Sequence, residues 1–193
     1  MQISEILKHV PDKRIDKNTT SLQFKRDIID FFMPLQLKQC VEIGTSLGYS
    51  TYILSHIFEH VTTIDIHLED LMKAKEFNKD RKNINYLLGD SGESDWDQNT
   101  LFDVAFIDAN HRYLYVMKDS MKSIQFGTEN MYIIFDDYGL PEPAPAVKVA
   151  VDELLNNNTL KFVKYIGEPK GNEPRIGKPL VDWEGIITQV NIK

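Results

Sequence analysis

The chain has 193 residues, of which 42% are hydrophobic and 26% charged, and this balance excludes a disordered or fibrous protein. Its formal net charge of −7 disfavours a nucleic-acid partner, because phosphate contacts need a basic face. The single cysteine, Cys40, excludes an internal disulfide. No stretch reaches membrane-spanning length and no signal-peptide pattern opens the chain, so we expect a cytoplasmic protein with no membrane partner.

The first part of the chain is predicted to be helical and to precede the main sheet. Apolar residues share one face of a short helix over residues 2–9. A second helix spans 22–33 and ends at Pro34, which cannot continue the helical hydrogen bonds. We expect a helical segment, 1–37, and an α/β core, 38–193, that together form one domain.

From residue 39 onward, short apolar runs alternate with helical patterns, which is typical of a parallel sheet covered on both faces. The last two runs have no helix between them and should pair antiparallel. The predicted strands are 39–44, 60–66, 84–90, 102–108, 131–137, 160–167 and 183–191, with helices after Gly48 and at 68–81, 113–125 and 145–157. The fold class is therefore α/β: a Rossmann-like, doubly wound, seven-stranded sheet, mostly parallel, with an antiparallel C-terminal strand.

Acidic residues follow one strand after another at the edge where ligands bind in such sheets. They are Glu42, Asp65, Asp90, Asp108, Asp136 and Asp137. Any one of them is equally well explained as a helix cap. Five successive strands with this feature instead indicate a binding site at the carboxyl ends of the strands.

The turn after the first strand, EIGTSLGYST at 42–51, brings backbone close to a ligand. It has neither a dinucleotide-binding G-x-G-x-x-G pattern nor a phosphate-binding loop, and Glu42 would repel phosphate. A carboxylate here suits a ligand with a cationic end. Asp65 lies at the tip of the second strand, where an acidic side chain accepts hydrogen bonds from a ribose diol. A ribose joined to a cationic, amino-acid-like end describes S-adenosylmethionine.

At this point the motif EIGTSLGYS resembles class I S-adenosylmethionine-dependent methyltransferases, and more narrowly the catechol O-methyltransferase-like group of small-molecule and sugar O-methyltransferases. The resemblance covers about residues 38–140. It implies that the turn holds the methionine end, Asp65 the ribose and Asp90–Ser91 the adenine region. The cofactor-binding residues expected on this basis are Glu42, Gly44, Thr45, Gly48, Tyr49, Ser50, Asp65, Asp90, Ser91 and Asp108. Tyr49 and Ser50 are alternatively explained by packing and helix capping.

A second group of polar residues lies in FIDANHRY, 106–113, and IIFDDYG, 133–139. Asp108, Asp136 and Asp137 end two strands that are neighbours in the doubly wound order, and like charges so close are costly. A divalent cation, Mg²⁺ or else Mn²⁺ or Ca²⁺, relieves this repulsion. The family resemblance also implies metal ligands at these positions, although Asp137 stands where the family often has Asn.

His111, three residues after Asp108, occupies the spacing at which the catechol enzymes place a lysine base. Its ordinary pKa of about 6.5 suits a general base for deprotonating the acceptor. The predicted catalytic residues are therefore His111 and Asp108. An equally weighted alternative is that His111 only orders its loop or bonds a carboxylate.

The predicted function is a divalent-metal-dependent O-methyltransferase that acts on a small hydroxylated acceptor, a sugar or a phenol. Two alternatives stay open at this stage: a metal-independent methyltransferase acting on nitrogen or on a macromolecule, and a non-catalytic module that binds an adenosyl ligand. We expect the acceptor to be selected by the N-terminal segment, residues 141–145 and the loop 168–182. Family habit alone implies a homodimer.

Overall fold

The structure is a computed structural model that describes residues 2–13, 16, 19–94, 96, 97, 99–141, 145–173 and 179–191. The strands are β1 (Gln39–Ile43), β2 (His60–Asp65), β3 (Ile84–Leu88), β4 (Phe102–Ile107), β5 (Gly127–Phe135), β6 (Leu160–Ile166) and β7 (Gly185–Val190). The helices are α1 (Ile3–Leu7), α2 (Leu22–Phe32), α3 (Tyr49–Ile57), α4 (Leu68–Phe77), α5 (Tyr113–Gln125) and α6 (Pro145–Asn156), with a 3-10 turn η1 (Met33–Leu35) after α2.

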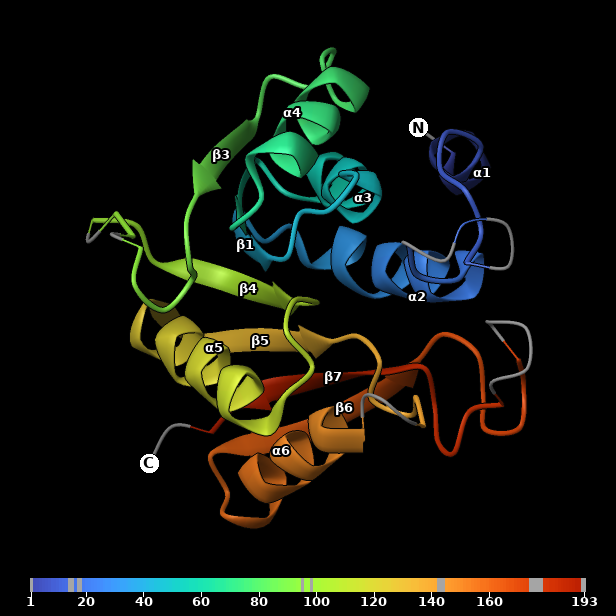
Figure 1. The fold of residues 1–193 in the computed structure, drawn as a ribbon, viewed down its shortest axis with the longest axis vertical. Coiled ribbons are helices and arrows are strands. Elements are labelled where there is room, and N and C mark those ends of the chain that lie inside the picture. Colours follow the sequence, from blue (N-terminus) through green and yellow to red (C-terminus); the bar gives the residue numbers. More distant parts are fainter. Residues whose placement is uncertain are drawn as a thin grey trace.

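The strands form one seven-stranded sheet in the order β3-β2-β1-β4-β5-β7-β6 (Figure 1). β1 pairs in parallel with β2 and β4, and β5 continues the parallel part beside β4. β7 lies antiparallel between β5 and β6. The predicted fold class is confirmed, including the antiparallel pair at the C-terminal end.

Helices cover both faces of the sheet, which explains why β4 is apolar on both faces from Val104 to Ile107. Val104 and Phe106 of β4 pack in the same cluster as α2 and α3. Ala105 and Ile107, the alternate residues, pack with α5 and α6 on the opposite face. The free thiol of Cys40 is buried, as expected for a small apolar side chain in β1. None of the helices in the described part of the chain has the length and hydrophobicity needed to cross a bilayer.

The N-terminal helices are placed by packing and by one cap. Ser21 accepts a hydrogen bond from the backbone N–H of Phe24 at 3.1 Å and so begins α2. α2 ends at Phe32, directly before η1, whose second residue is Pro34. α1 packs with α2 and α3 through Ile6 and Leu7. Between α1 and α2 the described residues are irregular and reach the carboxyl ends of the strands.

Two predicted boundaries differ from the structure by four residues, while the others agree to within one or two. The helix predicted over 68–81 ends at Phe77, because the side-chain amide of Asn78 donates to the carbonyls of Gly48 and Ala74 at 2.9 and 3.0 Å. The strand predicted from 131 begins at Gly127, and its pairing with β4 shifts register between Phe102 and Val104. Both differences come from contacts between elements that local periodicity does not report.

Gly44, directly after β1, is required by the close approach of two strand ends. Its φ is +98°, and a Cβ atom there would lie 1.9 Å from the backbone oxygen of Asp108. Gly171 offers a matched comparison, because its φ is +87° but a Cβ atom added there would have no described residue other than its chain neighbours within 4 Å.

We therefore expect Gly44→Ala to lower the free energy of unfolding by about 3 kcal/mol or more, since it adds a clash with backbone to the strain of positive φ. Gly171→Ala should cost only the conformational strain, about 1 kcal/mol. Urea denaturation of both variants beside the wild type measures the two losses. Equal losses would contradict the close approach at Gly44.

Candidate active site

A cavity of about 560 Å³ lies at the carboxyl ends of the parallel strands. Its volume is within the range of small-molecule sites. Five of the predicted cofactor-binding residues line it: Gly44, Asp65, Asp90, Ser91 and Asp108. The same cavity is lined by His111, Asp136 and Asp137, so both predicted polar groups open into one space.

Asp65 is fixed at the end of β2 by two backbone groups. The N–H of Ser46 donates to Oδ2 and the N–H of His67 donates to Oδ1, each at 2.9 Å. Ser46 adopts a left-handed φ of +47° to make its bond. A carboxylate oxygen can accept more than one hydrogen bond, so Asp65 can still accept from the hydroxyls of a ribose. The position predicted to bind a ribose is therefore rigid before any ligand arrives.

Glu42 does not line the cavity but is fully buried beneath the turn. Thr51 and Thr63 donate to its Oε2 at 2.5 and 2.6 Å, and Thr45 bonds the Thr63 hydroxyl at 2.6 Å. Burial raises the pKa of Glu42 to about 7, although the two threonine hydrogen bonds oppose the rise. Its predicted contact with the cofactor stays a prediction; the geometry gives Glu42 a role in shaping the turn.

The other predicted residues of the turn also lie outside the cavity lining. Thr45 is buried, and Gly48 precedes α3 with a φ of +78° against Ala74 and Asn78. Tyr49 packs edge-on against Phe77, with ring centroids 4.9 Å apart. Ser50 lies in the first turn of α3. Their predicted cofactor contacts are untested.

A buried acid, Asp119 of α5, lines the cavity next to Asp90 and Ser91 and was missed by the sequence analysis. The Ser91 hydroxyl donates to its Oδ1. Burial raises the pKa of Asp119 to about 6, opposed by the Ser91 bond. From sequence alone, Asp119 is one polar residue within an amphipathic helix, and only the packing of α5 against the sheet brings it to the cavity.

The second group is centred on Asp137, which has a left-handed φ of +56°. Its Oδ2 lies 3.1 Å from Nε2 of His111, and the same nitrogen lies 3.9 Å from Oδ1 of Asp108. One ligand atom from each of these three residues falls within 4.8 Å of the others, a spacing that could hold a metal ion. The neighbouring carboxylates, Asp108 first and then Asp137, raise the pKa of His111, against the effect of its burial.

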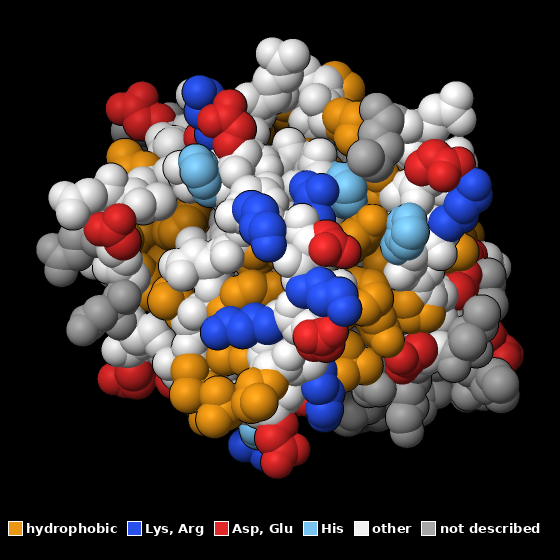
Figure 2. Space-filling view, turned by 90° about the horizontal axis from the view of Figure 1, so that it is seen from above, with side chains coloured by type: hydrophobic (Ala, Val, Ile, Leu, Met, Phe, Trp, Pro, Cys, Tyr) orange, Lys and Arg blue, Asp and Glu red, His pale blue; other side chains and the backbone are white. Residues whose placement is uncertain are grey.

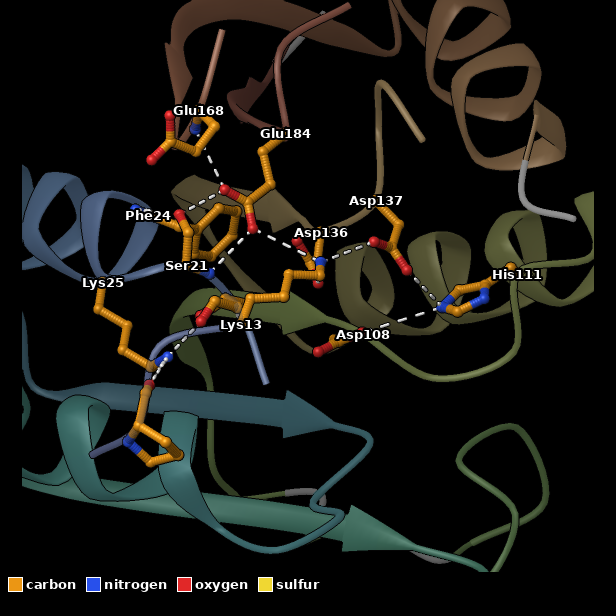
Figure 3. A network of polar contacts seen from close by, with 12 residues as sticks. Lys13, Ser21, Phe24, Lys25, Asp108, His111, Asp136, Asp137, Glu168 and Glu184 are labelled. Atoms are coloured by element: carbon orange, nitrogen blue, oxygen red, sulfur yellow. Dashed lines mark hydrogen bonds and ion pairs between the residues drawn. The ribbon is translucent and has the colours of Figure 1, made fainter. Parts of the chain in front are cut away.

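Asp136 is placed differently from its two predicted partners, because a lysine from the N-terminal segment reaches it (Figure 3). Nζ of Lys13 lies 3.5 Å from Oδ2 of Asp136, 3.0 Å from Oδ1 of Asp137 and 3.5 Å from Oε1 of Glu184. All four side chains are almost completely buried. The group that could hold a metal therefore contains His111 in place of the predicted Asp136, whose role as a ligand is untested.

Lys13 is held in place by the segment around it. Glu184, directly before β7, accepts from the backbone and hydroxyl of Ser21 at 2.9 and 2.5 Å and from the backbone of Glu168 at 3.1 Å. Lys25 donates to the carbonyls of Pro11, at 3.0 Å, and Thr20. These bonds close the irregular segment before α2 over the sheet. No motif or spacing in the sequence marks Lys13 or Glu184.

A Rossmann-like sheet with a ligand-sized cavity at the carboxyl ends of its strands is the architecture expected of a class I S-adenosylmethionine-dependent methyltransferase. A family model described as a methyltransferase domain matches residues 41–138, just over half of the sequence, and the chain belongs to this family. The predicted class is thereby confirmed. No curated protein matches the sequence.

Solved structures share the fold at low sequence identity. The O-methyltransferase TomG from Streptomyces achromogenes, solved with S-adenosylmethionine, is 13% identical, with a TM-score of 0.70 over 99% of this chain and 89% of TomG. The N-methyltransferase NodS from Bradyrhizobium japonicum is 15% identical, with a TM-score of 0.61 over 88% and 97%. The tRNA (m1A58) methyltransferase TrmI from Aquifex aeolicus is 20% identical, with a TM-score of 0.64 over 100% and 77%. Identities this low establish the fold and leave the acceptor open.

The buried Glu42 predicts a pH dependence of stability. Its pKa of about 7 in the native state exceeds the ordinary value of 4.5, so the native state holds the proton more tightly than the unfolded chain. The free energy of unfolding of the wild type should therefore fall as pH rises from about 4.5 to about 7, by about 3 kcal/mol from this residue.

Glu42→Gln removes this titration. Relative to the wild type, the variant should gain about 3 kcal/mol of stability between about pH 4.5 and pH 7.5, as measured by urea denaturation across that range. Glu129→Gln, at an exposed position of β5, is the control and should show no such gain. An unchanged pH slope in Glu42→Gln would show that Glu42 is not held neutral by its burial.

Proposed function

We propose that this methyltransferase transfers the methyl group of S-adenosylmethionine to an oxygen of a small hydroxylated acceptor such as a sugar or a phenol. The observation that carries the proposal is the single cavity in which Asp65 and Gly44 share a space with Asp108, His111 and Asp137. The proposal is supported because a carboxylate suited to a ribose and groups suited to deprotonating a hydroxyl open into one ligand-sized volume.

The cofactor end of the cavity fits S-adenosylmethionine by its chemistry. The backbone after Gly44 approaches the ligand, Asp65 accepts from the ribose hydroxyls, and Asp90, Ser91 and Asp119 lie where the adenine would extend. Bound there, the cofactor supplies an activated methyl group. The contribution of the chain is to align donor and acceptor and to exclude water.

The acceptor end fits a divalent cation at Asp108, His111 and Asp137, because their ligand atoms already converge. The set mixes carboxylate oxygen, which suits Mg²⁺ and Mn²⁺ alike, with imidazole nitrogen, a softer ligand that disfavours the hard Mg²⁺ ion, so Mn²⁺ is the better fit of the two. Such an ion would lower the pKa of an acceptor hydroxyl. A neutral His111 that ligates a cation through Nε2 carries its proton on Nδ1 and cannot accept another, so its role as base belongs to the ion-free form of the site.

A metal-independent mechanism is the second candidate, favoured by the ion pairs of Lys13 with Asp136 and Asp137. In that case Nε2–H of His111 would face the carboxylates of Asp137 and Asp108, and Nδ1 would be the nitrogen that accepts the acceptor proton. Methyl transfer to a nitrogen atom would also be detected in the acceptor assays that test the metal.

A small acceptor fits the surface better than a nucleic acid. On α4 and just after its end, at the top of Figure 1, Lys73 pairs with Asp70 and Lys79 with Glu76, at 3.1 and 2.9 Å. Basic side chains on the face seen from that end are interspersed with acidic and hydrophobic ones (Figure 2). A phosphate backbone would need a more uniformly basic face. A homodimer remains a proposal from family habit.

Metal removal separates the two mechanisms. The formation of S-adenosylhomocysteine would be measured with catechol, a hexose and tRNA as alternative acceptors, before and after dialysis against a chelator. We expect transfer to catechol or the hexose to fall about tenfold or more and to return with Mn²⁺. Activity that survives chelation but is lost in His111→Ala would support the metal-independent mechanism, and transfer to tRNA alone would contradict the proposed acceptor class.

The cofactor end can be tested without any acceptor. Asp65→Ala removes the carboxylate expected to bind the ribose and should weaken S-adenosylhomocysteine binding about 10- to 100-fold in calorimetry. Glu69→Ala, in the exposed first turn of α4, should bind like the wild type. Urea denaturation without ligand shows whether Asp65→Ala is also less stable. Unchanged affinity in a stable Asp65→Ala would exclude this site for the ribose.

A further inference from the structure

The acidic cluster contains a positive charge of its own. Lys13 comes from the segment between α1 and α2, and its side chain is only 1% exposed. Its Nζ is within 3.5 Å of three carboxylates, those of Asp136, Asp137 and Glu184. In Figure 3 it lies between Glu184 on one side and the pair Asp136 and Asp137 on the other.

We propose that Lys13 is the resident cation of this cluster: it occupies the place between Asp136 and Asp137 and confines any divalent ion to the outer group of Asp108, His111 and Asp137. Lys13 is thus a positioning residue of the acceptor site. The catalytic role of the outer group rests on the proposed function, but the placement of Lys13 can be tested by itself.

The distances give the first argument. A divalent ion lies about 2.0–2.6 Å from its oxygen ligands. An ion bridging Oδ2 of Asp136 and Oδ1 of Asp137 would need the volume that Nζ of Lys13 already fills at 3.5 and 3.0 Å. The ammonium and a bridging ion are therefore mutually exclusive at these two oxygens.

The two oxygens of Asp137 give the second argument, because they face different partners. Oδ1 is bound by Lys13, and Oδ2 lies 3.1 Å from Nε2 of His111. Asp108 approaches the same nitrogen from the other side. The outer group remains compact while Lys13 is in place, so the inner ammonium and an outer ion can be present together.

The anchoring of the segment gives the third argument. Glu184 accepts three hydrogen bonds from Ser21 and Glu168, and Lys25 is tied to the carbonyls of Pro11 and Thr20. Lys13 therefore enters the cluster from a backbone held on both sides, and its ammonium is buried with the carboxylates. Removing it would leave buried carboxylates uncompensated, which favours replacement by another cation.

The experiment compares Mn²⁺ binding by wild type, Lys13→Met and Lys25→Met, using calorimetry and the Mn²⁺-induced change in melting temperature. Both variants remove a buried ammonium, that of Lys13 before α2 or that of Lys25 within α2, but Lys25 contacts backbone carbonyls where Lys13 contacts carboxylates. Lys13→Met should bind Mn²⁺ about tenfold tighter than wild type and regain melting temperature when Mn²⁺ is added. Lys25→Met should melt lower with unchanged Mn²⁺ affinity. Lys13→Met with wild-type affinity, or an equal gain in both variants, would overturn the proposal.

Asp136 provides a test that keeps Lys13 and does not depend on the folding of Lys13→Met. Oδ1 of Asp136 is buried and has no hydrogen-bond partner among the described residues, so it is the atom through which Asp136 could still reach an ion. With Lys13 unchanged, Asp137→Asn should weaken Mn²⁺ binding about tenfold more than Asp136→Asn. Equal losses would show that Asp136 is a ligand and contradict the proposal.

The two proposals fail in different ways. If wild type binds no Mn²⁺ but Lys13→Met does, Lys13 is the resident cation and the metal-dependent mechanism is excluded. If wild type binds Mn²⁺ and Lys13→Met binds it no tighter, the metal site stands and the assignment of Lys13 falls. Lys13→Arg, which keeps the charge, should retain the Mn²⁺ affinity of wild type.

Discussion

The acceptor end of the cavity depends on the neutralisation of carboxylates that the fold itself brings together. The carboxyl ends of parallel strands lie at the same edge of the sheet, so the side chains that follow β4 and β5 must share a small volume. Glu184 is added from the antiparallel side of the sheet. Like charges buried together are costly, and each needs a cation or hydrogen-bond donors. In the structure, acidic and basic side chains alternate, and each lies within 3.9 Å of the next (Figure 3). The series is Glu184, Lys13, Asp137, His111 and Asp108.

The two ends of the cavity are built on different principles. At the cofactor end, Asp65 is held by backbone N–H groups, and Gly44 is fixed by contact with the backbone of Asp108. These interactions do not change with protonation of a side-chain partner. At the acceptor end, the contacts are between charged side chains, so their strength depends on which protons and ions are present. A rigid end for the common cofactor and an adjustable end for the chemistry are consistent with one transferase site.

The sequence was sufficient for the features that depend on local pattern. Apolar runs and their spacing predicted the strands, and the rule that ligands bind beyond the carboxyl ends of strands placed Asp65, Asp108 and Asp137 at one cavity. Glu42 shows the limit of this reasoning. Its position beside the glycine turn favoured contact with a ligand, but Thr51 and Thr63 turn its carboxylate inward.

Lys13 and Glu184 could not be found from sequence for a related reason. A lysine in a short polar segment resembles a solvated surface residue, and a glutamate before a strand resembles an edge charge. Their pairing requires the irregular segment before α2 and the start of β7 to meet at the sheet, a contact between opposite ends of the chain. The periodicity of apolar residues describes how one element buries its own face, and it contains no information about a contact between two distant segments.

This meeting also links charge to specificity. The segment that contributes Lys13 also contributes Thr19, which lines the cavity. Ser21, two residues further on, both caps α2 and binds Glu184. Neutralisation of the carboxylates, the start of α2 and part of the acceptor wall are therefore set by one short stretch of chain. Residues 142–144 and 174–178, within the other two segments expected to select the acceptor, lie outside the described residues. A change in the segment before α2 would alter the shape of the wall and the charge behind it together, so under the proposed function this segment would specify the acceptor oxygen and the cation that faces it jointly.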